Sequence, residues 1–150
     1  MYKYSNNSKA ELDTCHPDLI KVFNEVIKYT NVDVTIVQGN RSIIEQQELY
    51  AQGRTKPGSI VTNIDGVDNI SKHNVFPSEA VDICAYVNGN VTWDKDHLVY
   101  LGGVVMSIAN RLYDEGVIRH KIRWGGNWDS DGVIISDQNF MDLPHYELIK

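Results

Sequence analysis

The sequence predicts an α+β fold in which helices pack on a small, mainly antiparallel sheet. Apolar residues recur at helical spacing over 17–30 and 95–115. Short apolar or alternating segments at 33–38, 80–86, 121–124 and 146–149 are typical of strands. These segments do not alternate in the rhythm of βαβ units, which disfavours a parallel sheet. The length of 150 residues suits a single domain over 1–150.

Local signals support the helices. Pro17 can open the first helix, and its buried stripe is Leu19, Phe23, Val26 and Ile27. Ser42 and Glu45 have the spacing of a capping box, so we expect a second helix to run to about Gln52 and stop at Gly53. The long helix ends at Gly116, and its apolar stripe is Leu98, Leu101, Val105, Ile108 and Leu112.

Two loops are long for a compact domain. Residues 53–79 are rich in Gly, Asn, Asp, Ser and Pro, which indicates either a functional or a disordered segment. A polar loop from Gly125 to Gln138 precedes the last strand. Because Pro144 breaks regular pairing, we expect Asp142 to lie just outside that strand.

Composition excludes some classes of function. The chain has 14 basic and 20 acidic residues, a net charge of −6 and no Lys/Arg-rich run, so nucleic acid is not an expected partner. No apolar run approaches the ~20 residues of a membrane span, and the polar start lacks a signal core. Cys15 and Cys84 could pair, but a chain of this size needs no disulfide, so we expect two buried reduced thiols.

A first candidate site lies in the segment SKHNVFPSEAVD. His73 falls in the loop and Asp82 on the strand, with the small Ala80 two residues before the acid and on the same face. Val81 and Ile83 would face the core. An ionised acid placed among such residues needs a partner, because burying it alone is costly, and a metal ion supplies one.

A second candidate site lies in the segment DLPHYEL. Asp142 stands three residues before His145, and Pro144 between them would let both side chains approach one point. The alternative interpretation is a turn before an edge strand. A lone histidine is usually a surface or satisfied polar residue. The acids near His73 and His145 are what make these two histidines candidate ligands. His97 starts the long helix and His120 stands before a strand, so we expect both to be structural or exposed.

These two segments together resemble the zinc D-alanyl-D-alanine peptidase family, especially its phage branch of L-alanyl-D-glutamate endopeptidases. The family pattern is S-x-H, A-x-D and a C-terminal acid-x-x-H, and here it is SKHNVFPSEAVD and DLPH. QGNRSIIEQQELYAQGRTKPGSIVT and RWGGNWDSDG are also similar to the phage branch. The resemblance covers nearly the whole chain and implies the fold of hedgehog and D-alanyl-D-alanine peptidase domains.

The resemblance also implies site residues. His73, Asp82 and His145 would hold one zinc ion and leave a fourth position for water. Asp142 would be the general base that activates this zinc-bound water. Many carboxypeptidases have glutamate as the base, so the aspartate favours the endopeptidase branch. Arg41 would bind a substrate carboxylate or stabilise the oxyanion.

Further residues have two interpretations each. Gln46 and Arg54 match family positions in or near the substrate groove, but Arg54 equally suits a solvated turn. Ser71 could hydrogen-bond near the zinc or order its own loop, and we favour the loop role. Trp124, like Trp128 and Phe140, could line the cleft or anchor the last loop on the core.

Residues 127–138 partly match a calcium-binding loop. Oxygen-bearing side chains fall at the first, third and fifth positions, Asn127, Asp129 and Asp131, with Gly132 sixth. Position twelve is Gln138, and Asp137 falls one place early. The sequence is therefore compatible with a Ca²⁺ site or with a solvated acidic turn.

We expect a zinc peptidase that hydrolyses the peptide stem of bacterial peptidoglycan, at the L-alanyl-D-glutamate bond. It would act as a monomer without nucleic acid or membrane partners. Lacking an export signal, it would be made in the host cytoplasm and reach the cell wall after release. Two alternatives stay open: a D-alanyl-D-alanine carboxypeptidase or dipeptidase, and a non-catalytic zinc-containing module that binds the wall.

Overall fold

The computed structural model describes residues 1–138 and 140–150, and its architecture confirms the predicted α+β class. In chain order the elements are α1 (Asn6–Leu12), α2 (Pro17–Tyr29), β1 (Asp33–Gln38), α3 (Ile43–Ala51), β2 (Ala80–Val87), β3 (Asn90–Thr92), α4 (Lys95–Asp114), β4 (Lys121–Gly125) and β5 (Asp142–Ile149).

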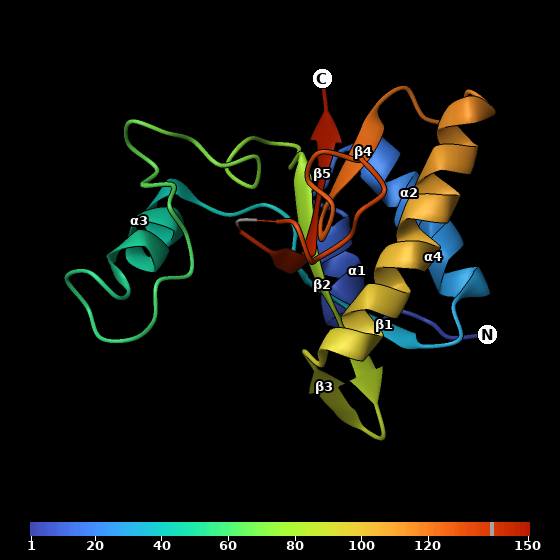
Figure 1. Ribbon diagram of the computed structural model, residues 1–150, viewed down its shortest axis with the longest axis horizontal. Coiled ribbons are helices and arrows are strands. Elements are labelled where there is room, and N and C mark those ends of the chain that lie inside the picture. The colour runs from blue at the N-terminus through green and yellow to red at the C-terminus, as the bar shows by residue number, and fades with distance from the viewer. Residues whose placement is uncertain (139) are drawn as a thin grey trace.

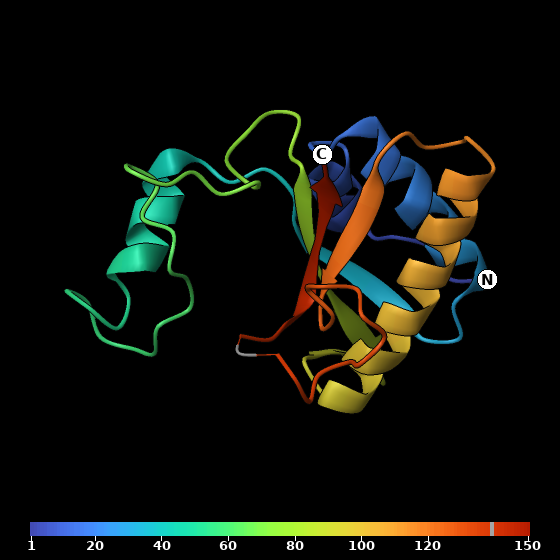
Figure 2. The same ribbon diagram turned by 45° about the horizontal axis from the view of Figure 1, so that its top comes forward.

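The strands form an antiparallel sheet. Its order is β1-β2-β5-β4, and β3 extends β2 as a short hairpin. Helices α2 and α4 lie side by side on one face of the sheet (Figure 1). Helix α3 and the loop 53–79 project away from the opposite side of the molecule, as the turned view also shows (Figure 2). We call α3 and this loop the arm.

Strand alternation separates a core face from a polar face. The buried residues that share the core face of β2, β4 and β5 are Val81, Ile83, Ile122, Trp124, Tyr146 and Leu148. Phe23 of α2 packs edge-on against Tyr146, with ring centroids 5.7 Å apart. Because successive side chains point to opposite faces, Asp82, Arg123, His145 and Glu147 lie together on the other face.

The predicted helix starts are confirmed. The Ser42 hydroxyl accepts from Glu45 N, and the Glu45 carboxylate accepts from Ser42 N, which completes the capping box of α3. Pro17 is in the first turn of α2, whose N-cap is His16. Asp94 caps α4 through His97 N. These contacts satisfy amide groups that a helix leaves without intrahelical partners.

The structure differs from the predictions in three elements. Helix α1 and strand β3 were not expected, because seven and three residues carry too little periodicity to recognise. The expectation that Asp142 lies outside the last strand is wrong. Strand β5 begins at Asp142, which pairs with Gly125, and a register shift next to Trp124 absorbs the residues around Pro144.

Two expectations from composition agree with the structure. Among the described residues, no helix is both long enough and apolar enough to span a membrane. Cys15 and Cys84 are buried free thiols, as predicted. Burial raises the pKa of the Cys15 thiol to about 12, so this group packs as a small apolar side chain.

Candidate metal centre and substrate cavity

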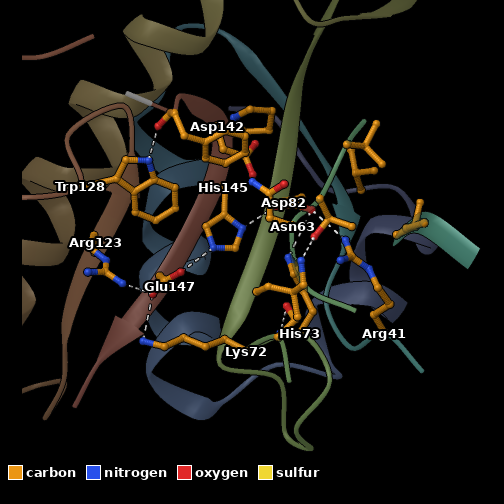
Figure 3. A pocket seen from close by; sticks show the side chains of 18 of the residues that line it. Arg41, Asn63, Lys72, His73, Asp82, Arg123, Trp128, Asp142, His145 and Glu147 are labelled. Atoms are coloured by element: carbon orange, nitrogen blue, oxygen red, sulfur yellow. Dashed lines mark hydrogen bonds and ion pairs between the residues drawn. The ribbon is translucent and has the colours of Figure 1, made fainter. Parts of the chain in front are cut away.

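A cavity of about 750 Å³ opens on the polar face of the sheet, between the sheet and the arm. Its walls come mainly from the polar face of β2, β4 and β5, from the arm, and from the loop after β4. Figure 3 shows the charged side chains that converge in it. Those that line it are Arg41, Lys72, His73, Asp82, Arg123, Asp142, His145 and Glu147.

His73 enters the cavity from the end of the arm and is 2% exposed. Its Nδ1 lies 2.7 Å from the carbonyl oxygen of Gly39. A carbonyl can only accept, so Nδ1 carries a proton, and Nε2 is the nitrogen that a metal ion could use. Buried Nε2 makes no hydrogen bond to any described residue, although it lies 3.3 Å from Asp82 Oδ2. This nitrogen is available to a metal ion.

Asp82 and His145 are directly opposite each other on β2 and β5. The distance from His145 Nδ1 to Asp82 Oδ1 is 3.0 Å. Burial alone would raise the pKa of Asp82, but the contacts with His145 and His73 outweigh it and hold that pKa below its usual value. Burial would likewise lower the pKa of His145, but Asp82 and Glu147 raise it to about 9. Asp82 therefore faces both imidazoles as an ionised carboxylate.

The three side chains fit a divalent metal ion. His73, Asp82 and His145 each offer a ligand atom, and these atoms all lie within 4.8 Å of one another. Two imidazoles and one carboxylate are a donor set that zinc accepts. The orphaned Nε2 of His73 supports this fit, because a buried nitrogen without a partner is otherwise costly. Sequence reasoning identified all three residues, and the structure brings them together.

Arg41 is held firmly beside this triad. Its Nε donates to Gln38 Oε1 at 2.8 Å, and its Nη1 donates to Gln46 Oε1 at 2.9 Å. Its Nη2 lies 3.5 Å from Asp82 Oδ2. Gln46 is fully buried, and its side chain also donates to the Ile64 carbonyl. It does not line the cavity, so its role is to orient Arg41.

Asp142 lines the cavity at the start of β5. Burial, with the nearby charge of Asp82, raises the pKa of Asp142 above its usual value. A carboxylate with a raised pKa takes up a proton more readily, as a general base requires. Gly125 permits this position, since a Cβ there would lie 2.0 Å from the Asp142 carbonyl oxygen.

Sequence reasoning missed a second group of charges. Glu147 Oε1 accepts from His145 Nε2 at 2.8 Å, and its Oε2 contacts Arg123 Nη2 at 2.7 Å and Lys72 Nζ at 3.0 Å. Burial opposes ionisation, but these three donors lower the pKa of Glu147. Strand alternation could have found Glu147, because it lies two residues after His145 on one face.

The remaining candidates have mixed positions. Ser71 lines the cavity, and its hydroxyl accepts from His73 N at 3.2 Å, so it orders the loop as favoured. The structure does not bring Arg54 or Trp124 to the cavity wall. Arg54 holds its own loop through the carbonyls of Tyr50 and Thr62. Trp124 is 4% exposed on the core face, where its Nε1 donates to the Leu143 carbonyl.

Trp128 is an aromatic residue that reaches the candidate metal centre. It lines the cavity, with its ring centroid 5.6 Å from that of His145. Its Nε1 donates to the Phe140 carbonyl at 2.6 Å, which ties the loop after β4 to the start of β5. Phe140 also lines the cavity. Of the two interpretations of these aromatic residues, cleft lining describes Trp128 and Phe140, and anchoring on the core describes Trp124.

Two other groups of possible ligands occur among the described residues. In the first, Asp18 accepts from His120 Nδ1 at 2.8 Å, and His16 Nδ1 accepts from Asp18 N, so these atoms already hold two segments together. His120 is thus structural, as expected. The second is Asp129, Asp131 and Asp137 of the predicted calcium loop. These exposed carboxylates lie within 4.8 Å of one another, and each also accepts a local hydrogen bond, as in an acidic turn.

The chain is similar over most of its length to known peptidases. A family model described as phage L-alanyl-D-glutamate peptidase matches residues 1–149. The peptidoglycan L-alanyl-D-glutamate endopeptidase CwlK of Bacillus subtilis (strain 168) is 34% identical over 124 residues, 79% of this chain. That match spans 62% of CwlK, less than two thirds of its length.

Two further relatives match over most of their length. The L-alanyl-D-glutamate peptidase of Escherichia phage T5 is 28% identical over 150 residues, which cover 99% of this chain and 98% of the phage protein. The crystal structure of the Serratia marcescens L-Ala D-Glu endopeptidase ChiX superimposes with a TM-score of 0.69 and 25% identity, covering 98% of this chain and 90% of ChiX. With a family match over residues 1–149, this chain belongs to the phage L-alanyl-D-glutamate peptidase family.

Proposed function

We propose that this chain is a zinc-dependent endopeptidase that hydrolyses the L-alanyl-D-glutamate bond in the peptide stem of bacterial peptidoglycan. The observation that carries the proposal is the convergence of His73, Asp82 and His145 in a cavity that also contains a separate, half-buried acid, Asp142. A purely structural metal site has no use for such an acid. The activity named for the family and its relatives supports the choice of bond.

Different residues bind the metal and transfer the proton. His73 Nε2, His145 Nδ1 and the Asp82 carboxylate would hold the ion. Zinc, when bound, supplies a Lewis acid and lowers the pKa of a water molecule at its open position. Asp142 takes a proton from the attacking water and returns one to the leaving amine. Arg41, fixed by Gln38 and Gln46, orients the peptide and stabilises negative charge on the carbonyl oxygen.

Muropeptide mapping tests the bond. Purified cell-wall stem peptides are digested with zinc-loaded protein and with protein treated with a chelator, and the products are identified by mass spectrometry. We expect new amino-terminal D-glutamate only with the metal present. Release of terminal alanine alone would instead support the carboxypeptidase alternative. A protein that binds one zinc ion but cuts no wall preparation would support the binding module.

Replacing Asp142 tests the proton transfer. Asp142→Asn keeps the size of the side chain but cannot take up a proton, so we expect kcat to fall by about 10²–10⁴-fold. Zinc content, measured by atomic absorption, should stay at the wild-type value, because Asp142 is not one of the three ligands. A variant with wild-type lytic activity would show that another group is the base.

A further inference from the structure

One wall of the cavity has more positive than negative charge. Arg123 of β4 and Lys72 at the end of the arm both contact a single carboxylate oxygen, Glu147 Oε2, at 2.7 and 3.0 Å. Two cations facing one anion leave one unit of positive charge. Figure 3 shows these three side chains beside His145, on the opposite side of the metal centre from Arg41. We call Arg123 and Lys72 the cationic wall.

The charge of the whole cavity also differs from that of the chain. Its basic lining residues, Arg41, Lys72 and Arg123, equal its acidic ones, Asp82, Asp142 and Glu147, in number. With both histidines neutral, as metal ligands are, these side chains sum to zero, and a divalent ion makes the sum positive, whereas the chain as a whole carries −6. Such a local reversal favours an anionic substrate group.

Arg123 is the better placed of the two cations to bind that group. Its Nη2 contacts Glu147, but its buried Nε has no hydrogen-bond partner among the described residues. Its guanidinium carbon lies 5.3 Å from the ring centroid of Trp128, which limits its freedom. Lys72 Nζ has more of its donors engaged, since it contacts both Glu147 and the Leu148 carbonyl. A planar guanidinium held in place matches a carboxylate.

The chemistry of the bond supplies such a carboxylate. A glutamate residue whose nitrogen is acylated by alanine has two carboxyl groups, and the peptide continues through only one of them. The other remains as a free carboxylate near the bond to be cut, unless it is amidated. Because Glu147 bridges Arg123 to His145, the cationic wall lies one side chain away from a metal ligand, close to where this group would lie.

We propose that Arg123 determines substrate specificity by pairing with the free carboxylate of the glutamate on the leaving side of the bond, with Lys72 adding charge. This proposal rests on the proposed function. It makes the protein selective for stem peptides that carry an unmodified carboxylate over those with a carboxamide at that position. A competing explanation is that Arg123 only holds Glu147, and through it His145, in place.

Two synthetic stem peptides that differ only in a carboxylate or a carboxamide on the D-glutamyl residue separate these explanations. The kcat/KM of the zinc-loaded protein is measured for both by chromatography. We expect the wild type to prefer the carboxylate by about tenfold to hundredfold, the effect of one charge-assisted contact. Arg123→Gln should reduce this preference to near unity, and Arg123→Lys should keep part of it.

The matched control is Arg119→Gln, which makes the same charge change at an exposed position outside the cavity. It should keep the wild-type ratio. If Arg123→Gln lowers kcat/KM for both peptides by one factor, Arg123 acts only through Glu147 and the proposal is wrong. A wild-type ratio near unity with correct cleavage would overturn the proposal and leave the proposed function intact. Failure to cut either peptide at this bond would overturn both. Should Arg123→Gln not fold, the ratio for Arg123→Lys decides.

Discussion

At the scale of single residues, the candidate metal centre depends on how each imidazole is oriented. His73 gives one ring nitrogen to the Gly39 carbonyl, and His145 gives one to Glu147. In both rings the other nitrogen points to Asp82. A histidine that donates to a fixed acceptor has its tautomer and ring angle set before the metal arrives. The Glu147 carboxylate is the stronger of these two acceptors, because it is charged.

We predict that Glu147→Gln weakens zinc binding about 10- to 100-fold. The neutral amide oxygen accepts the His145 proton less strongly, so Nδ1 becomes a poorer ligand. Zinc affinity is measured by competition with a chromophoric chelator, and circular dichroism checks folding. Glu25→Gln is the control, because Glu25 also contacts two cations, Lys28 and Arg111, but lies on α2. Equal affinity in both variants would show that Glu147 does not support the metal site.

At the scale of elements, the sheet places the site and the helices supply the core. The sequence is sufficient to predict α2, β1, α3, β2, α4 and β4, because capping residues and periodicity mark their limits. It is also sufficient to predict the outward position of Asp82 between Val81 and Ile83. It does not predict that Arg123 pairs with Glu147, because this register depends on the irregularity between Trp124 and Gly125.

The same alternation explains why Trp124 belongs to the core. It lies one residue after Arg123 and therefore points to the opposite face, where it packs against α4. A family motif identifies a residue type at a position, but only the strand direction decides which face that residue occupies. Trp128 escapes this constraint because it lies in the loop after β4 and can turn back over His145.

Neighbouring glycines of α4 provide a direct test of this packing. A Cβ at Gly102 would lie 2.4 Å from the Trp124 ring, whereas a Cβ at Gly103 meets nothing within 4 Å. We predict that Gly102→Ala destabilises the protein by about 1–3 kcal/mol through overpacking. Gly103→Ala should stabilise it by about 1 kcal/mol, because alanine favours the helix interior. Urea unfolding measures both. Changes of the same sign would contradict the packing of Trp124 on α4.

At the scale of the whole molecule, the metal centre lies where the arm joins the sheet. Arg41 leaves the sheet towards α3, and His73 returns from the loop. The Arg41 amide donates to the His73 carbonyl at 2.7 Å, and the Asn74 side chain donates to the Arg41 carbonyl. The segments at the two ends of the arm are thus tied to each other beside Asp82. The site therefore requires both the arm and the sheet, although α3 itself buries little more than Gln46.

A separate contact joins the start of α2 to the segment just before β4. Asp18 at the start of α2 accepts from the amides of Arg119 and His120 at 3.0 and 3.1 Å, and from the His120 ring. These partners are 101 and 102 residues away in sequence, just before β4. The contact can form only when the first and last parts of the core are assembled, so its loss should appear in global unfolding.

We predict that Asp18→Asn lowers the free energy of unfolding at pH 7 by about 1.5–3 kcal/mol, the contribution of hydrogen bonds to a charged group. Burial opposes ionisation of Asp18, but the His120 ring and the two amides together lower its pKa. A folded-state pKa below the unfolded value of about 3.9 means that this stabilisation is complete above that pH. It is lost as the pH falls through the lower, folded-state pKa. The difference in unfolding free energy between wild type and variant should therefore shrink in acid.

Urea unfolding at pH 7 and across the acid range measures this difference, with the exposed Asp114→Asn as control. A difference that is constant with pH would mean that the charge of Asp18 makes no contribution.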